Sequence, residues 1–431
     1  MTDAPMSKDD GQEVFFLRYH DCSSKRLMYI PRMGSLRLVD REESERLSRN
    51  PEQAPASVAE SAYPAAVTGA LKEPVTGIAL TDACTLGCRY CYTAGPRPHR
   101  PPMAQGALRG IMHALIDEKL ERGGFPLLRI AFFGGGEPTC DPEQFRQAAT
   151  LIHEEAYRRG LAVSLSMTTN GCFTGLADFI RDNFAQVTLS IDGPEPLHDL
   201  HRPYPDGTGS FALVLDNARR LYESDLNVTF RATVSTATLA IWKEFVDFFA
   251  AEFPGCSLMV EPVAGFGRAK GGFSSPSEQA FEKEMYEAFV YSRGKIDLFT
   301  PATRNPARPS GHFCGASSGR SRIIASDCSI RAYPYPDTEG LFGLHYMEKT
   351  GAALKMPSPQ TGNDPSKSMR SVSCRDCFCK YSCAGGCPAI RWSGAGILAC
   401  NLTRNITENK LAEMYDEAHF GATPQTPQGN W

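Results

Sequence analysis

The chain has 431 residues, more than a single hydrophobic core usually supports, so two or three subdomains are expected. With 42% hydrophobic and 22% charged residues, its composition is that of a soluble globular protein. The net charge of −4 gives no support for a nucleic-acid or membrane-surface partner.

Fifteen cysteines are many for a chain of this length. The polar start MTDAPMSKDDGQ lacks the apolar core of a secretory signal, and no uninterrupted apolar run approaches the roughly 20 residues of a membrane helix. We therefore expect a cytoplasmic protein whose thiols stay reduced and bind metals or clusters. The Asn-x-Thr sequences at Asn401 and Asn405 are then chance matches inside a C-terminal helix.

The N-terminal part, residues 1–70, is predicted to be a small β-rich unit followed by a linker. VFFLRYH, RLMYIP and LRLVD have strand-like patterns, PRMG is a turn, and a short helix follows up to residue 48. Residues 50–70 are rich in Pro, Ala, Ser and Glu, which is typical of a linker.

From Gly77, strand-like and helical patterns alternate, which predicts an α/β domain over 71–300 with a partial, TIM-like (β/α)6 barrel. In such sheets the active site lies at the carboxyl ends of the strands. The expected strands are 77–80, 127–133, 162–169, 186–192, 227–234 and 256–263, and the expected helices are near 103–122, 142–159, 175–183, 210–223, 239–252 and 276–293.

After about residue 300 the alternation stops. The loop-rich, cysteine-rich stretch 301–415 has little material for an apolar core, so it is predicted to be a C-terminal domain organised by bound clusters. The tail, 416–431, which ends in ATPQTPQGNW, is predicted to be disordered.

Three cysteines follow the first barrel strand in TDACTLGCRYCYT: Cys84, Cys88 and Cys91. Closed metal sites and ordinary four-iron clusters use four protein ligands. Three thiolates on one loop can hold three irons of a four-iron, four-sulfur cluster and leave the fourth open. An open iron can bind a substrate or cofactor, so this loop indicates chemistry rather than a structural staple.

After the second strand comes FFGGGEPT, in which glycines allow close backbone approach and Glu137 can bind an ammonium group. Together with the three-cysteine loop and the six βα units, this pattern resembles the radical S-adenosylmethionine (SAM) superfamily over about residues 75–265. The resemblance implies that Cys84, Cys88 and Cys91 bind the cluster and that its open iron chelates SAM. One electron from the cluster would cleave SAM to a 5′-deoxyadenosyl radical, which abstracts hydrogen from an unactivated carbon.

The same resemblance implies further cofactor contacts. Gly135, Gly136 and Glu137 would hold the SAM ammonium, Arg202 would lie near its carboxylate, and Tyr90 would pack on the adenine or cover the cluster. The residues expected to face the ribose and methionine portions are Thr169, Asn170, Ser190 and Asp192. Turn and capping roles remain the alternative for these four residues, and a surface salt bridge for Arg202.

The C-terminal cysteines resemble the SPASM extension of radical SAM enzymes, which holds two auxiliary four-iron clusters. By that pattern an outer cluster would have four ligands and an inner cluster would use Cys314 and Cys387. A structural zinc site is the alternative for the same spacing. The outer ligands would be Cys374, Cys377, Cys383 and Cys400.

One stretch, ASDCSIRAYPYPD, departs from the SPASM pattern. Cys328 stands at the place of a turn glycine, and Tyr333 or Tyr335 stands where a cysteine ligand is usual. The inner cluster would therefore use Cys328 as a displaced ligand, keep an open iron, or be absent. Asp337 lies near the position of a catalytic aspartate in sulfatase-maturating members, although its register is shifted.

The leading functional hypothesis is a maturase that installs a crosslink or similar modification in a ribosomally made peptide. The resemblance implies a precursor peptide or protein substrate and a flavodoxin- or ferredoxin-type electron donor. One alternative is an anaerobic, formylglycine-generating sulfatase-maturating enzyme, which the missing cysteine near Tyr333 disfavours. The other alternative is a zinc- or cluster-binding protein without radical activity.

Overall fold

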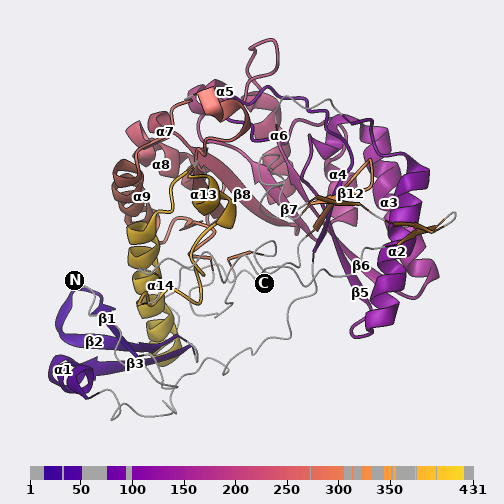
Figure 1. Cartoon of the computed structure of the whole chain (residues 1–431). Helices are drawn as coiled ribbons and strands as arrows, with labels where there is room; N and C mark the ends of the chain where they lie inside the picture. The colour runs from indigo at the N-terminus through magenta and orange to yellow at the C-terminus, as the bar shows by residue number, and fades with distance from the viewer. Residues whose placement is uncertain are drawn as a thin grey trace.

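The computed structural model describes residues 14–31, 34–50, 75–93, 100–271, 273–304, 313–314, 322–331, 344–346, 348–350, 353–355, 374, 376–394 and 396–421. Its largest part is a curved, mostly parallel sheet with helices along its outer face (Figure 1). The predicted linker and the terminal ATPQTPQGNW lie outside the described residues.

The N-terminal unit is a three-stranded antiparallel sheet followed by one helix, which confirms the prediction. Because side chains alternate along a strand, the sheet has two apolar faces. One face carries Phe15, Leu17 and Tyr29, which pack against a C-terminal helix, and the other carries Met28, which packs near α1. The elements are β1 (Phe15–Tyr19), β2 (Cys22–Ile30), β3 (Ser35–Asp40) and α1 (Arg41–Arg49).

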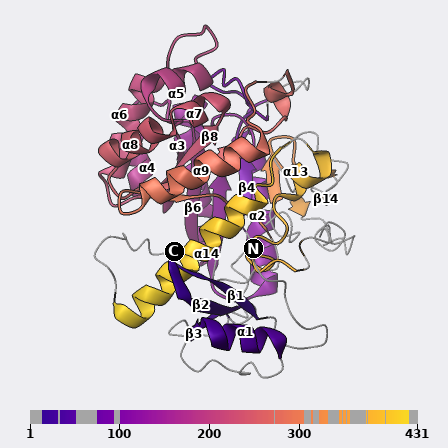
Figure 2. The ribbon, with the colours of Figure 1, turned by 90° about the vertical axis from the view of Figure 1, so that its left-hand side faces the viewer.

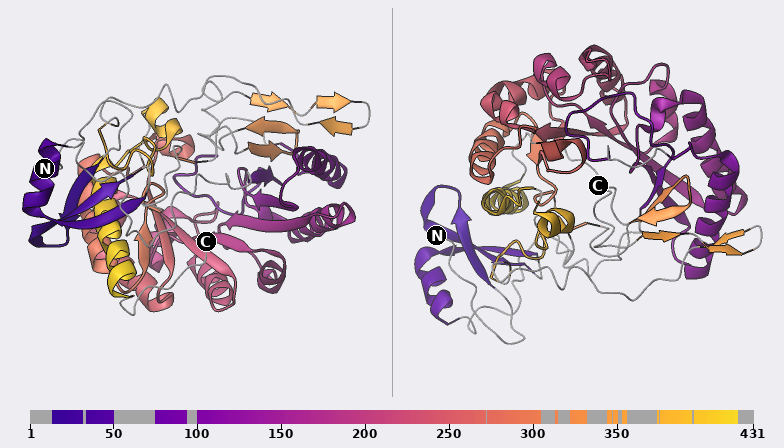
Figure 3. Two further views of the ribbon diagram at one scale, coloured as in Figure 1. Left: turned by 90° about the horizontal axis from the view of Figure 1, so that it is seen from below. Right: turned by 45° about the horizontal axis from the view of Figure 1, so that its top comes forward.

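All six predicted barrel strands form, and they pair in parallel in chain order. The strands curve around one interior, as the right-hand view of Figure 3 shows. They are β4 (Thr76–Ala79), β5 (Leu127–Phe132), β6 (Ala162–Thr169), β7 (Gln186–Ser190), β8 (Asn227–Val234) and β9 (Ser257–Pro262).

The barrel sheet includes strands from beyond residue 300, where the predicted alternation of strands and helices stops. A short strand, β10 (Asp297–Phe299), adds to β9, and β11 (Arg322–Ala325) pairs in parallel with β4. The antiparallel strands β12 (Ser329–Arg331) and β13 (Leu344–Tyr346) continue from β11. Residues beyond 300, predicted to form a separate domain, therefore extend the barrel sheet.

The helices cover the outer face, and two of them were not predicted: α5 (Glu195–His201) and α7 (Thr236–Ala240). The predicted start at Asp141 is confirmed, because its side chain accepts hydrogen bonds from the backbone of Glu143 and Gln144. The other helices are α2 (Gln105–Arg122), α3 (Pro142–Arg158), α4 (Ala177–Asn183), α6 (Phe211–Tyr222), α8 (Trp242–Glu252) and α9 (Glu278–Ser292).

The C-terminal part contains α13 (Pro388–Ser393) and the long helix α14 (Cys400–Phe420). Figure 2 shows α14 passing along α9 and reaching the N-terminal sheet. Two carboxylates of α9 accept bonds from the first turn of α14: Glu278 from the backbone of Ala399 (3.1 Å) and Glu282 from that of Asn401 (2.7 Å).

Two predictions about the C-terminal region have definite outcomes. Asn401 and Asn405 lie in a helix, as expected. The tail was predicted to be disordered from residue 416, but α14 continues to Phe420, because Leu411 and Ala412 anchor it against the N-terminal sheet. Among the helices that the structure describes, none is long and apolar enough to cross a membrane.

Candidate active site

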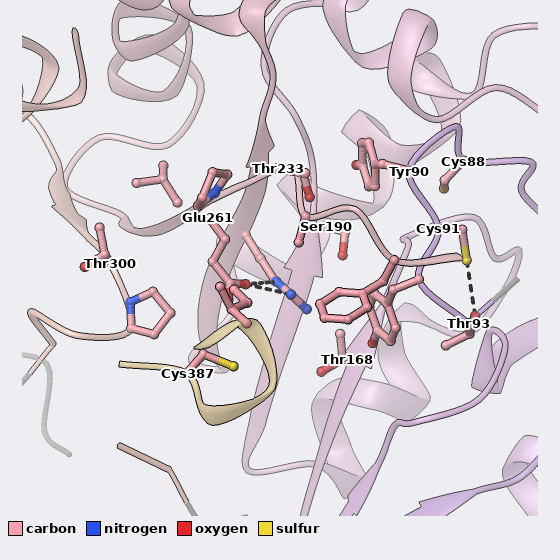
Figure 4. A pocket seen from close by; sticks show the side chains of 18 of the residues that line it. Cys88, Tyr90, Cys91, Thr93, Thr168, Ser190, Thr233, Glu261, Thr300 and Cys387 are labelled. Carbon is pink, nitrogen blue, oxygen red and sulfur yellow. Dashed lines mark hydrogen bonds and ion pairs between the residues drawn. The ribbon is translucent and has the colours of Figure 1, made fainter. Parts of the chain in front are cut away.

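A cavity lies at the carboxyl ends of the barrel strands, where the sequence placed the active site. One wall is the cysteine loop with the Gly135–Glu137 turn, and the opposite wall comes from the C-terminal part, with Cys387 and Ile390. The ends of β6 to β9 lie between these walls, and Figure 4 shows Cys88 and Cys91 across the cavity from Cys387.

The three predicted cysteines, Cys84, Cys88 and Cys91, all line this cavity from the loop after β4. Burial raises the pKa of the Cys88 thiol to about 11. The loop backbone is fixed from its far side. Pro203 accepts a bond from the Gly87 backbone N–H (2.7 Å), and Arg268 donates to the carbonyl of Cys88 (3.0 Å).

The Gly135–Gly136 pair has a role that the sequence did not indicate. The backbone N–H of Gly136 donates to the carbonyl of Thr81 (2.7 Å), and that of Glu137 donates to the carbonyl of Ala83 (2.8 Å). A Cβ atom on Gly136 would lie 1.8 Å from the Ala83 carbonyl oxygen, and one on Gly135 would lie 2.4 Å from that of Thr81. The glycines are therefore required for the turn to pack against the start of the cysteine loop.

The Glu137 carboxylate is buried and connects two segments. Its Oε1 accepts bonds from the hydroxyls of Thr139 (2.7 Å) and Thr169 (2.8 Å), and its Oε2 accepts one from the backbone N–H of Asn170 (2.7 Å). Burial raises the pKa of Glu137, although these donors oppose the shift. Much of its hydrogen-bonding capacity thus serves to hold the ends of β5 and β6 together.

Asn170 extends this connection to the cysteine loop. Its Nδ2 donates to the Thr85 hydroxyl (3.0 Å) and lies 3.7 Å from the Cys84 sulfur, while its Oδ1 accepts a bond from the backbone N–H of Cys172 (2.8 Å). The amide is held at both ends, so it fixes the loop relative to β6.

Asp192 is fully buried and does not reach the cavity wall, whereas Ser190 does. The period-two pattern placed both residues on one face, but β7 ends at Ser190 and the alternation ends with it. The Asp192 carboxylate accepts bonds from the Tyr90 hydroxyl, from His201 Nδ1 (3.0 Å) and from the backbone N–H of Thr233 (3.0 Å).

Arg202 completes this buried group, with Nε 3.1 Å from Oδ2 of Asp192. Burial opposes ionisation of Asp192, but the charge of Arg202 and the bond from His201 hold the pKa of the carboxyl well below its usual range. The guanidinium carbon lies 5.3 Å from the centre of the Tyr90 ring, and both residues line the cavity. Asp192 thus positions two cavity residues rather than facing the cavity itself.

His198 lies beside Asp192, and its burial leads us to expect a pH effect on the stability of the fold. Its Nδ1 accepts a bond from the Asp192 backbone N–H (3.3 Å), and its Nε2 lies 3.1 Å from the Ser210 hydroxyl. Burial lowers its pKa from 6.5 to about 3, so the unfolded chain binds the proton more tightly. Stability from this residue is complete above pH 6.5 and falls by about 1.4 kcal/mol per pH unit below it, down to pH 3.

Denaturant unfolding at pH 7 and pH 5, with His198→Gln as the comparison, measures this contribution. The variant should lose less stability on acidification than the parent chain. An equal loss in both chains would contradict a neutral, buried His198.

Sequence reasoning missed an ion pair inside the cavity. Arg231 on β8 and Glu261 on β9 are joined by Nε–Oε2 (2.7 Å) and Nη2–Oε2 (2.6 Å) contacts, and each side chain is about a quarter exposed. In the register of these strands Thr233 lies opposite Glu261, so all three side chains share the inner face. The sequence did show a charged residue in each of two predicted strands, Arg231 and Glu261. Only the register between β8 and β9 shows that the two side chains lie next to each other.

The C-terminal cysteines form two groups. Cys383 is partly buried, and this burial, followed by the charges of the neighbouring Cys400, Cys377 and Cys374, raises the pKa of its thiol to about 12. Cys314 and Cys387 belong to a different cluster around Phe266. The four predicted outer ligands are thus electrostatic neighbours, whereas Cys314 and Cys387 pack around Phe266, and their assignment to two clusters stays a prediction.

Cys328, which stands at the place of a turn glycine, adopts a left-handed backbone conformation (φ 61°) in the turn between β11 and β12. It packs on the barrel core, whereas Cys314 and Cys387 pack around Phe266. Tyr333, Tyr335 and Asp337 lie outside the described residues, so the departure at these positions stays a prediction.

The donor set suits an iron–sulfur cluster, because cysteine thiolates are its usual ligands. Three thiols on one wall, with a buried Arg202 whose Nε lacks a well-aligned hydrogen bond, fit an anionic cluster with a carboxylate-bearing cofactor.

An open parallel half barrel with three cysteines in the loop after its first strand is the arrangement expected of a radical SAM domain. Residues 78–249 match the model of the radical SAM superfamily, so the chain carries a radical SAM domain. Enzymes of this superfamily use a four-iron, four-sulfur cluster with SAM. The match to this enzyme superfamily therefore argues against the alternative of a zinc- or cluster-binding protein without radical activity.

Among curated relatives, the serine-type anaerobic sulfatase-maturating enzyme of Klebsiella aerogenes is 24% identical over 325 residues, which are 71% of this chain and 77% of that protein. The cysteine-type enzyme of Clostridium perfringens is 27% identical over 186 residues, 41% of this chain and 50% of that one. The solved structure of native anSMEcpe with bound AdoMet covers 80% of this chain and 99% of its own, with a TM-score of 0.60 and 18% identity, which supports the fold.

Proposed function

We propose that the chain is a radical SAM maturase that modifies an unactivated carbon of a peptide or protein. The observation that carries this proposal is the cavity with the three-cysteine loop on one wall and Cys387 on the other. A cluster held by Cys84, Cys88 and Cys91, with SAM on its open iron, would supply the 5′-deoxyadenosyl radical. The chain supplies binding, orientation and exclusion of water.

The residues around the cysteine loop suit the binding of SAM. Gly135 and Gly136 bring backbone close to the cavity, and Thr169 and Asn170 line it from β6. Ser190 and Arg202 line the adjoining wall, where the guanidinium can bind a carboxylate. Glu137 retains Oε2, which has one protein donor, for an ammonium group.

The other half of the cavity suits the substrate. Its wall includes Phe281, Phe313, Ile390 and Leu398, and the Arg231–Glu261 pair lines the same cavity. Apolar pockets use a few placed polar groups to orient a ligand. An arginine donor beside a carboxylate acceptor matches the carbonyl and N–H groups of a peptide.

Within this class, modification of a ribosomally made peptide remains the leading hypothesis. The N-terminal sheet packs on α14 outside the barrel, through Leu17 and Leu411 and the pair of Arg18 with Glu408 (2.7 Å). A sheet outside the barrel can bind an extended leader peptide as an added strand. The names of the curated relatives support sulfatase maturation as the second candidate. A flavodoxin- or ferredoxin-type protein would supply the electron in either case.

Reductive cleavage of SAM tests the proposed class. The reconstituted, reduced chain should bind about eight to twelve irons and release 5′-deoxyadenosine from SAM, as measured by chromatography. The triple variant Cys84→Ala, Cys88→Ala, Cys91→Ala should bind about four irons fewer and release none. Conversely, cleavage by this variant would show that the cluster site is misassigned. Cys256→Ala, at a buried position directly before β9, is the matched control and should retain cleavage.

A second experiment separates the two substrate classes. The Cp18Cys and Kp18Cys peptides, both bound in structures of anSMEcpe, are incubated with the active chain, in parallel with short peptides encoded beside its gene. A mass change only in a neighbouring-gene peptide supports peptide maturation. A change in Cp18Cys or Kp18Cys supports sulfatase maturation instead.

A further inference from the structure

Two arginines lie against the C-terminal cysteine quartet (Cys374, Cys377, Cys383 and Cys400). Arg391, on α13, has Nη2 3.7 Å from the sulfur of Cys374. Arg404 lies one helical turn after Cys400 on α14 and is a charged neighbour of Cys377. Both guanidinium groups are also charged neighbours of Cys400.

Neither cation is neutralised by an acidic side chain within the part of the chain that the structure describes. Arg391 otherwise bonds the carbonyl of Gly385, with Nε at 2.8 Å, and Arg404 bonds the amide oxygen of Asn401 at 2.5 Å. Both of these acceptors are uncharged. Other arginines pair with carboxylates, as Arg18, Arg100, Arg202, Arg219, Arg231 and Arg322 do.

We propose that Arg391 and Arg404 raise the reduction potential of a four-iron cluster held by this quartet. The inference rests on the proposed cluster site. A thiolate-bound cluster gains one negative charge when it takes up one electron, so a nearby positive charge stabilises the reduced form more than the oxidised form. Hydrogen bonds to the sulfurs act in the same direction, and they are a recognised control of cluster potentials.

Carboxylates near the quartet act in the opposite direction. Glu278 is a charged neighbour of Cys400, but its Oε1 accepts a bond from the Ala399 backbone N–H at the start of α14. Asp376 precedes Cys377 in the chain and is exposed, so solvent and salt screen its charge. Among the described residues, the two arginines therefore outweigh these carboxylates.

The cysteine loop of the barrel also has cations nearby. Arg202 is a charged neighbour of Cys88, but its Nε lies 3.1 Å from the carboxylate of Asp192. Arg268 donates to the carbonyl of Cys88 rather than to a sulfur. The quartet differs in that the guanidinium of Arg391 lies 3.7 Å from a cysteine sulfur.

EPR-monitored redox titration of the reconstituted full-length chain tests the proposal. The signal of this cluster is the one that Cys383→Ala removes. Arg391→Gln and Arg404→Gln should each lower the equilibrium constant for one-electron reduction of this cluster about tenfold. This corresponds to a shift of about 59 mV to more negative potential. Arg391→Lys and Arg404→Lys keep the charge and should stay near the parent value.

Lys410→Gln is the matched control, because it removes one positive charge from the same helix, where Lys410 pairs with Asp297 (3.1 Å). It should leave the potential unchanged. Glutamine variants with full iron content and an unshifted potential would overturn the inference, as would lysine variants that shift as far as the glutamine variants. A parent chain that binds no iron at the quartet would overturn the proposed cluster site, and the inference with it.

Discussion

Asp192→Ala is expected to destabilise the folded chain by about 3–5 kcal/mol, because it leaves the buried charge of Arg202 without its partner. The carboxylate is fully buried and also accepts bonds from Tyr90, His201 and the Thr233 backbone. These partners belong to the cysteine loop, α5 and β8, so one substitution loosens three segments around the cavity. Denaturant unfolding of the metal-free chain under anaerobic conditions measures the loss.

Asp216→Ala is the matched control for this prediction. Asp216 forms an exposed ion pair with Arg220 (3.1 Å) on α6, and such pairs contribute at most about 1 kcal/mol. A loss at Asp192 no larger than the loss at Asp216 would show that the buried network does not hold the site together.

Gly136→Ala is expected to remove the barrel cluster while the rest of the fold persists. The new Cβ would lie 1.8 Å from the carbonyl oxygen of Ala83 and 2.5 Å from its carbon, and both atoms belong to the backbone just before Cys84. The loop must therefore shift by more than an ångström, and misplacement of that size costs about 100-fold in catalysis. Iron analysis should show about four irons fewer per chain. Release of 5′-deoxyadenosine should fall by at least about 100-fold.

Gly106→Ala provides the comparison on α2, because nothing lies within 4 Å of the added Cβ there. Alanine also favours the helix by about 0.5–1 kcal/mol, so this variant should retain its iron and gain slightly in stability. If Gly136→Ala retained full iron and activity, the turn would not be what places the cysteine loop.

Much of the architecture was predictable because its signals are local. The six barrel strands and most of their helices follow from apolar periodicity, and the Asp141 cap follows from three adjacent residues. β11 is an exception, since only four residues pair with β4 and Ile323 lies 246 positions from Gly77. No local pattern indicates such a partner.

The candidate site divides in the same way. Cys84, Cys88 and Cys91 are close together in the sequence, so their spacing alone indicated a cluster loop. The structure places this loop at the cavity. Asp192 was predicted to face the cofactor from a strand that in fact ends two residues earlier. The Arg231–Glu261 pair depends on the register of β8 against β9, which tertiary packing sets.

The sequence by itself therefore determined the chemistry: a three-thiolate loop on the first strand of a half barrel, and a second group of cysteines near the C-terminus. Only the tertiary structure decided what surrounds those thiols. It placed Arg202, which pairs with Asp192, beside Cys88, and it placed Arg391 and Arg404 beside the quartet. The reason is physical, because ligand spacing is a short-range property of the chain. The electrostatic field at a sulfur instead sums charges from segments that meet only on folding.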